Sequence, residues 1–137
     1  MNERVRQEIE LLRTKYPNLQ RGEKLDWVLL PDYPLPAGRY NREKTKLFFL
    51  ITSGYPLTAI DNFFVEAGLL FANGQGGIPA YREGSTPSGA PLPVPGNWGW
   101  FSWHPNAWRP AATIEGGDNL LTFLRAVNMC LRGEEPA

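Results

Sequence analysis

A hydroxyl, an imidazole and a carboxamide occur at alternate positions of a tryptophan-rich stretch, and a hydroxyl so close to an imidazole could be an activated nucleophile. Residues 98–110 hold four of the five tryptophans and the only histidine of the chain. In an extended backbone, side chains two residues apart point the same way, so Ser102 and His104 would share one face. A hydroxyl beside an imidazole is the minimal activated nucleophile, and Asn106 could donate to a developing oxyanion or hold the loop.

The same residues also have a structural interpretation. A lone histidine in a tryptophan-rich loop is often packed and hydrogen-bonded, and periodicity gives the direction of a side chain but not its reach. Pro105 biases His104 toward an extended backbone under either interpretation. The sequence leaves a catalytic and a structural role open.

Composition limits the classes of function. The 137 residues suit one domain, 1–137, that can bury a core without disulfides or a structural metal. Lysine plus arginine equals aspartate plus glutamate at 14 each, so no strong field attracts nucleic acid or an anionic membrane. We therefore expect neither as a partner.

Cysteine and histidine usage argues against metals and cofactors. The single cysteine, Cys130, excludes an internal disulfide and a Cys-pair metal site, which fits a reducing compartment. One histidine supplies no metal-ligand set, and no glycine-rich phosphate loop opens a helix. The N-terminus lacks the apolar core of a signal peptide, and no stretch approaches transmembrane length. We expect a cytoplasmic protein without a metal or cofactor.

Hydrophobic periodicity predicts an N-terminal helix followed by strands. Residues 2–16 carry the apolar stripe of an amphipathic helix, with Asn2 as a possible cap and Pro17 at its end. Predicted strands cover residues 25–30, 39–41, 45–51 and 62–66. The first is bounded by Pro31 and the second is a short edge strand. The third is continuously apolar, so we expect it in the middle of the sheet.

A second helix is predicted at the C-terminal end. Asp118 would be its N-cap and Gly133 would mark its end. The apolar stripe consists of Leu120, Leu124, Val127 and Leu131. Cys130 lies beside this stripe, which favours a buried thiol packed in the core over a reactive one. Residues 134–137 should be frayed.

Residues 67–97 contain seven glycines, five prolines and few large apolar side chains. They predict a long irregular loop, either a partner-binding or gating segment or a solvent-exposed insertion. The whole pattern predicts an α+β fold, in which N- and C-terminal helices cover one side of an antiparallel strand meander.

The order of motifs resembles the ubiquitin-conjugating enzymes. A Gly-Tyr-Pro turn at residues 54–56 precedes a strand, and His-Pro-Asn at 104–106 matches the tripeptide before the active site of that family. The resemblance is closer to a bacterial ubiquitin-conjugating-enzyme-like family and covers residues 25–131. Its motifs are Tyr-Pro-Leu-Pro-x-Gly-x-Tyr-Asn at 33–41, Gly-Tyr-Pro, Trp-Ser-x-His at 101–104 with Phe101 in place of Trp, and Trp-Arg-Pro at 108–110.

The resemblance implies a conjugation pathway with a ubiquitin-like protein and its activating enzyme as partners. In the conjugating enzymes a cysteine follows His-Pro-Asn and carries ubiquitin as a thioester, but no cysteine follows here before Cys130 in the predicted helix. One hypothesis is therefore a transferase in which Ser102 accepts the ubiquitin-like protein as an oxyester. His104 would be the general base and Asn106 or a backbone amide would hold the oxyanion, with Thr113 as a second candidate nucleophile.

The missing cysteine also motivates a hypothesis of a different class. The chain could keep the fold and act as a non-catalytic scaffold that binds a ubiquitin-like protein or its activating enzyme. The tryptophans, Ser102 and His104 would then be structural, and the 67–97 loop or the N-terminal helix would carry the interface.

Overall fold

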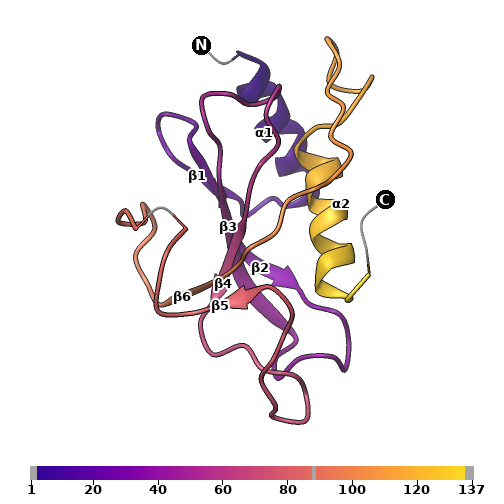
Figure 1. Ribbon diagram of the computed structural model, residues 1–137. Helices are drawn as coiled ribbons and strands as arrows, with labels where there is room; N and C mark the ends of the chain where they lie inside the picture. The colour runs from indigo at the N-terminus through magenta and orange to yellow at the C-terminus, as the bar shows by residue number, and fades with distance from the viewer. Residues whose placement is uncertain (1–2, 88, 135–137) are drawn as a thin grey trace.

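The computed structural model describes residues 3–87 and 89–134, in which two helices flank a six-stranded antiparallel sheet (Figure 1). Helix α1 (Glu3–Lys15) precedes the sheet and helix α2 (Leu120–Leu131) follows it. The strands are β1 (Gln20–Arg21), β2 (Trp27–Pro34), β3 (Lys44–Leu50), β4 (Phe63–Glu66), β5 (Tyr81–Arg82) and β6 (Trp98–Phe101). Their spatial order is β1-β2-β3-β4-β6-β5. The predicted α+β class and both predicted helices are confirmed; Asn2 and residues 135–137 lie outside the described residues.

Strand β3 lies in the interior of the sheet and is buried on both faces. Phe49 belongs to the main core and meets Phe123 of α2 edge to face, with ring centroids 5.1 Å apart. Phe48 belongs to a second apolar cluster and stacks on Phe64 of β4 at 4.4 Å. The predicted central strand is confirmed, and its continuous apolar run reflects burial on both faces.

Strand β2 differs from its prediction, because Pro31 does not end it. The strand continues to Pro34, and its register against β3 shifts between Leu30 and Tyr33. Proline has no N–H to donate, so a strand tolerates it where the ladder is interrupted by a bulge. The register shift provides that interruption, and β2 is longer than predicted.

The predicted edge strand at residues 39–41 is wrong. Tyr40 forms only an isolated bridge with Phe71, whose ring it stacks on at 6.0 Å. The Tyr40 hydroxyl instead donates to the carbonyl oxygen of Leu131 at 2.6 Å, at the C-terminal end of α2. The edge next to β6 is formed by β5, which lies within residues 67–97.

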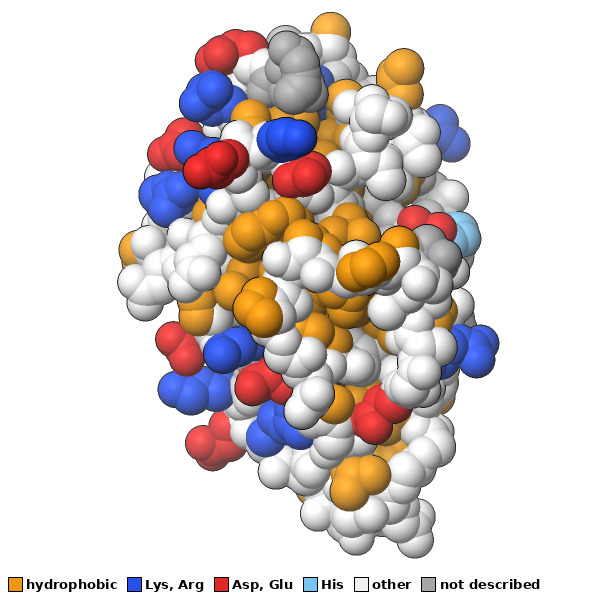
Figure 2. Space-filling model, turned by 90° about the vertical axis from the view of Figure 1, so that its left-hand side faces the viewer, with side chains coloured by type: hydrophobic (Ala, Val, Ile, Leu, Met, Phe, Trp, Pro, Cys, Tyr) orange, Lys and Arg blue, Asp and Glu red, His pale blue; other side chains and the backbone are white. Residues whose placement is uncertain are grey.

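The face of the sheet opposite the helices, here called the outer face, carries the second cluster. It consists of Leu29, Phe48, Phe64, Val94 and Trp100. Residues 92–97, here called the covering segment, contact this cluster through Leu92 and Val94, and Trp98 at the start of β6 packs beside them. Figure 2 shows apolar side chains gathered at the middle of this side of the molecule. The last part of the 67–97 loop therefore packs on the sheet.

Helix α2 is capped by Asn119 and not by Asp118. The Asn119 side chain accepts a hydrogen bond from the Thr122 amide at 3.1 Å, and the Thr122 hydroxyl accepts one from the Asn119 amide at 2.9 Å. The Asp118 carboxylate instead accepts a hydrogen bond from the Arg109 amide, and Asp118 lies one residue before the N-cap position. Gly133 follows the helix with φ +78°, as a left-handed terminator does.

Candidate functional site

The candidate residues lie on the segment that continues β6. Phe101 is buried, Ser102 is exposed, Trp103 is half-buried and His104 is exposed. Trp103 packs edge to face on Phe63, with ring centroids 5.7 Å apart, so it faces the main core. Alternation thus leaves Ser102 and His104 at the solvent-exposed positions of the segment.

Two residues in unusual backbone conformations hold this segment. The Ser102 amide donates to the carbonyl oxygen of Ala80, and the Asn62 amide donates to that of Trp103, both at 2.8 Å. Ala80 and Asn62 have φ +66° and +72°, in the left-handed region that side chains other than glycine rarely adopt. Such conformations cost on the order of 1–3 kcal/mol and persist only where surrounding structure enforces them. The Ser102–Trp103 backbone is therefore fixed from both sides.

The histidine ring lies against the backbone of the next residue. His104 Nδ1 lies 3.0 Å from the carbonyl oxygen of Pro105. A carbonyl oxygen can only accept, so this contact is a hydrogen bond in the tautomer that carries its proton on Nδ1, and in that tautomer Nε2 is the proton acceptor. Within the described residues, no hydrogen bond joins the Ser102 hydroxyl to this ring. The Ser102 hydroxyl and the His104 ring thus lie on one exposed segment without a hydrogen bond between them.

The loop after His104 is anchored at several points. Trp108 Nε1 donates to the carbonyl oxygen of Pro56 at 2.7 Å. Arg109 and Asp118 close the loop, because the Arg109 amide donates to the Asp118 carboxylate at 2.7 Å and the Asp118 amide donates to the Arg109 carbonyl at 2.9 Å. Thr113 lies within the closed loop, exposed, with its hydroxyl accepting from the Gly116 amide at 3.1 Å. Asn106 is exposed and lies between Trp103, whose carbonyl oxygen accepts from the Asn62 amide, and the Trp108 indole.

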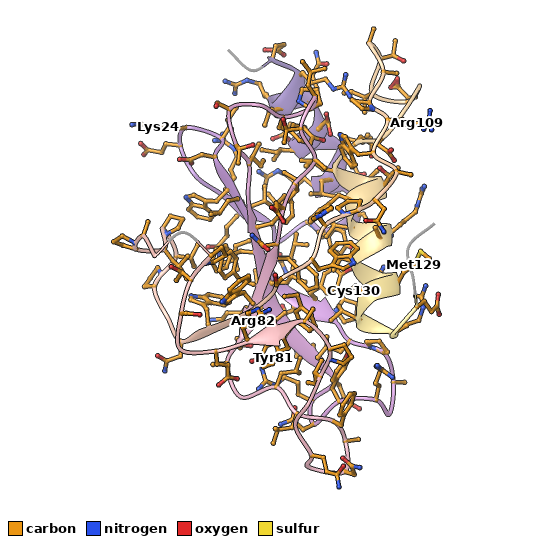
Figure 3. All side chains as sticks on the ribbon, in the orientation of Figure 1. Lys24, Tyr81, Arg82, Arg109, Met129 and Cys130 are labelled. Atoms are coloured by element: carbon orange, nitrogen blue, oxygen red, sulfur yellow. The ribbon has the colours of Figure 1, made fainter. Side chains whose placement is uncertain are left out.

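Cys130 lies far from the part of this loop that Arg109 and Asp118 close. Arg109 is held next to the start of α2, whereas Cys130 is one residue before the end of that helix (Figure 3). Cys130 follows Asn119 by eleven positions, a rise of roughly 16 Å along the helix. The thiol is half-buried, packs against the main core and lines a cavity of about 270 Å³ with Trp103. Cys130 is thus packed as predicted, though not fully buried.

Sequence reasoning missed a buried carboxylate, Glu8 of α1. Its residue is only 2% exposed, and its oxygens accept from Arg4, Tyr55 and the Leu120 amide. A glutamate on a helix usually lies on the solvated face, so the residue type alone does not indicate that Glu8 is buried. Its position does, because residue 8 lies beside Ile9, between the buried Val5 and Leu12 of the apolar stripe.

Within residues 3–87 and 89–134, no three His, Cys, Asp or Glu side chains gather as a metal site would require. Over the same ranges, neither α1 nor α2 combines the length and apolar character needed to cross a membrane.

The antiparallel sheet, the helices before and after it, and the His-Pro-Asn tripeptide after β6 define a fold like that of the ubiquitin-conjugating enzymes, the E2 class. A family model described as prokaryotic E2 family E matches residues 7–134. The chain belongs to this family, which places it in bacterial conjugation of ubiquitin-like proteins, with such a protein and an activating enzyme as its general partners. No curated protein and no solved structure matches the chain.

Proposed function

We propose that the protein carries a ubiquitin-like protein as an oxyester on Ser102, in place of the thioester that ubiquitin-conjugating enzymes form on cysteine. His104 Nε2 takes the proton from the Ser102 hydroxyl, whose oxygen attacks the activated C-terminal carbonyl of the ubiquitin-like protein. The bond from that carbonyl carbon to its leaving group on the activating enzyme then breaks. The leaving group takes the proton from His104, and Asn106 donates to the oxyanion in between.

The exposed row of Ser102, His104 and Asn106 on a fixed backbone is the observation that supports this proposal. A protein-sized acyl donor can reach only an accessible nucleophile. The tautomer that donates to the Pro105 carbonyl leaves Nε2 as the basic nitrogen, which a general base requires. Catalytic hydrogen bonds are often long or poorly aligned in a free enzyme and tighten in the complex with substrate. The lack of a hydrogen bond between Ser102 and His104 in the free protein is therefore compatible with catalysis.

Loading of the purified protein with its ubiquitin-like partner, activating enzyme and ATP tests the proposal. We expect an adduct that hydroxylamine cleaves and that thiol reductants leave intact. Ser102→Ala should abolish it, and His104→Gln should slow its formation roughly 10²- to 10⁴-fold. Thr113→Ala and Cys130→Ser are the matched controls and should load normally. An adduct retained in full by Ser102→Ala would overturn the assignment.

The scaffold function is the second candidate, favoured by the lack of a cysteine between His-Pro-Asn and Cys130. A scaffold would bind the ubiquitin-like protein or its activating enzyme without forming an adduct. Binding that survives the Ser102→Ala and His104→Ala double substitution, with conjugation in the reconstituted pathway unchanged, would select this function.

A further inference from the structure

The Glu8 carboxylate joins three parts of the molecule that are distant in sequence. Its Oε1 accepts from the Tyr55 hydroxyl at 2.5 Å and from the Leu120 amide at 2.8 Å, and its Oε2 accepts from Arg4 Nε at 2.7 Å. A buried carboxylate is costly unless its charge and lone pairs are satisfied, and here one cation and two further donors meet it. We call Arg4, Glu8 and Tyr55 the Glu8 cluster.

Arg4 extends the cluster to the loop that follows His-Pro-Asn. Its Nη1 donates to the carbonyl oxygen of Ala111 at 2.7 Å and lies 3.4 Å from that of Ala112. The Arg4 guanidinium, about 20% exposed, thus contacts both a carboxylate and a backbone turn. Arg4 therefore ties helix α1 directly to the loop.

Tyr55 extends the cluster to the other side of the same loop. Its ring packs against that of Trp108, with centroids 6.0 Å apart, and Trp108 Nε1 donates to the carbonyl oxygen of Pro56. Residues 104–107 therefore run between two anchors, namely the Asn62 to Trp103 backbone hydrogen bond and the Trp108 indole. The second anchor depends on where Tyr55 and Pro56 lie.

We propose that the Glu8 cluster positions the His104–Asn106 segment, so that Glu8 and Tyr55 are positioning residues for the acyl transfer, an inference that rests on the proposed function. Neither side chain touches the reacting atoms. Their effect is transmitted from the Tyr55 hydroxyl through the 55–56 turn to Trp108 and then along the loop to His104. Loss of the Tyr55 to Glu8 hydrogen bond releases the second anchor and lets the imidazole leave its reactive orientation.

Tyr33 provides a matched control. Like Tyr55 it is a buried tyrosine, 0% against 5% exposed, and its hydroxyl donates to Asn128 in the other half of α2. Tyr33→Phe and Tyr55→Phe each delete one buried hydroxyl and the hydrogen bond that it donates, so both variants lose stability in the same way. Only Tyr55 is connected to the loop.

The single histidine allows a test that needs no activity. At fixed pH, the imidazole C2–H signal of the full chain is one resolved NMR probe of His104. Tyr55→Phe should shift or split this signal and move the Trp108 indole N–H, while Tyr33→Phe should superimpose on the wild type. Glu8→Gln keeps an acceptor for Tyr55 and Leu120 but removes the negative charge that pairs with Arg4. This variant should perturb the same two probes less than Tyr55→Phe does. An unchanged His104 signal in folded Tyr55→Phe would overturn the positioning role.

Loading assays form the second arm. At saturating activating enzyme, Tyr55→Phe should lower the loading rate constant roughly tenfold to a hundredfold while the half-saturating concentration stays unchanged, because misplacement affects the reacting geometry. Equal rates for the Tyr55→Phe and Tyr33→Phe variants would overturn the positioning role. A wild-type protein that forms no adduct would refute the proposed function, and the NMR comparison would still decide whether the cluster positions His104.

Discussion

At the scale of single residues, Glu83 and Tyr81 link a two-residue strand to the neighbouring loop. Glu83 Oε2 accepts from the Tyr81 hydroxyl at 2.5 Å and from the Gly68 amide at 2.7 Å. These hydrogen bonds lower the pKa of the Glu83 carboxyl. Burial, followed by the hydrogen bond to Glu83, raises the pKa of Tyr81 to about 12.

The lowered pKa of Glu83 makes the stability of the protein depend on pH. A carboxyl whose pKa is lower in the folded state stabilises the protein above its ordinary pKa of about 4.3 and loses that contribution as the pH falls. Glu83→Gln should therefore destabilise the protein at pH 7 by less than about 1 kcal/mol, because the group is exposed. Urea unfolding of both proteins from pH 7 to pH 3 checks this. The difference should shrink as the pH falls below the ordinary carboxyl pKa, and a constant difference would contradict the charge-based explanation.

At the scale of elements, the N-terminus of α2 gives a prediction that separates two adjacent residues. Asn119 supplies the side-chain cap and also donates to the carbonyl oxygen of Ile114 at 3.0 Å. Asn119→Ala should cost about 1–2 kcal/mol in the free energy of unfolding, since capping residues contribute amounts of this size. Asp118→Ala, which removes only an exposed acceptor for Arg109, should cost less. Chemical denaturation ranks the two, and a larger loss for Asp118→Ala would show that the cap is assigned to the wrong residue.

The elements that were predictable are those with a strong apolar period. The stripes of α1 and α2 and the apolar run of β3 stand out because burial alone determines them. Strand β1, two residues long and without a buried side chain, has no such signal and forms only because β2 offers a free edge. The sequence does not distinguish Asp118 from Asn119 as the cap, because aspartate and asparagine cap helices equally well. The hydrogen bond from Arg109 to Asp118 depends on the folded loop and has no local sequence pattern.

The candidate site was predictable only where it follows a local sequence pattern. Alternation along an extended backbone predicts that Ser102 and His104 share one face, but not that this face is exposed to solvent. The supports of that segment come from elsewhere in the chain, since Asn62 and Ala80 hold its backbone and Glu8 lies 47 residues before Tyr55. Such partners carry no local pattern, so a single sequence does not reveal them.

At the scale of the whole molecule, the sheet separates two apolar clusters that should respond differently to damage. Phe48 meets Trp98 of β6 edge to face at 4.6 Å on the outer face and shares a cluster with Val94 of the covering segment, whereas Phe49 contacts Phe123 of α2 on the opposite face. Leucine at either position leaves space unfilled, at a cost of about 1–3 kcal/mol. The two variants should therefore be similarly destabilised but loosened on opposite faces.

Hydrogen exchange followed by mass spectrometry distinguishes these faces. Phe48→Leu should speed exchange mainly in the covering segment, because that segment is held on the sheet chiefly by the outer cluster. Phe49→Leu should speed exchange mainly in α2, which is held by the main core. If both variants raised exchange uniformly, all opening would occur by global unfolding and the outer face would have no stability of its own. Selective opening of the covering segment would instead show that the outer sheet surface can be exposed while both helices stay packed.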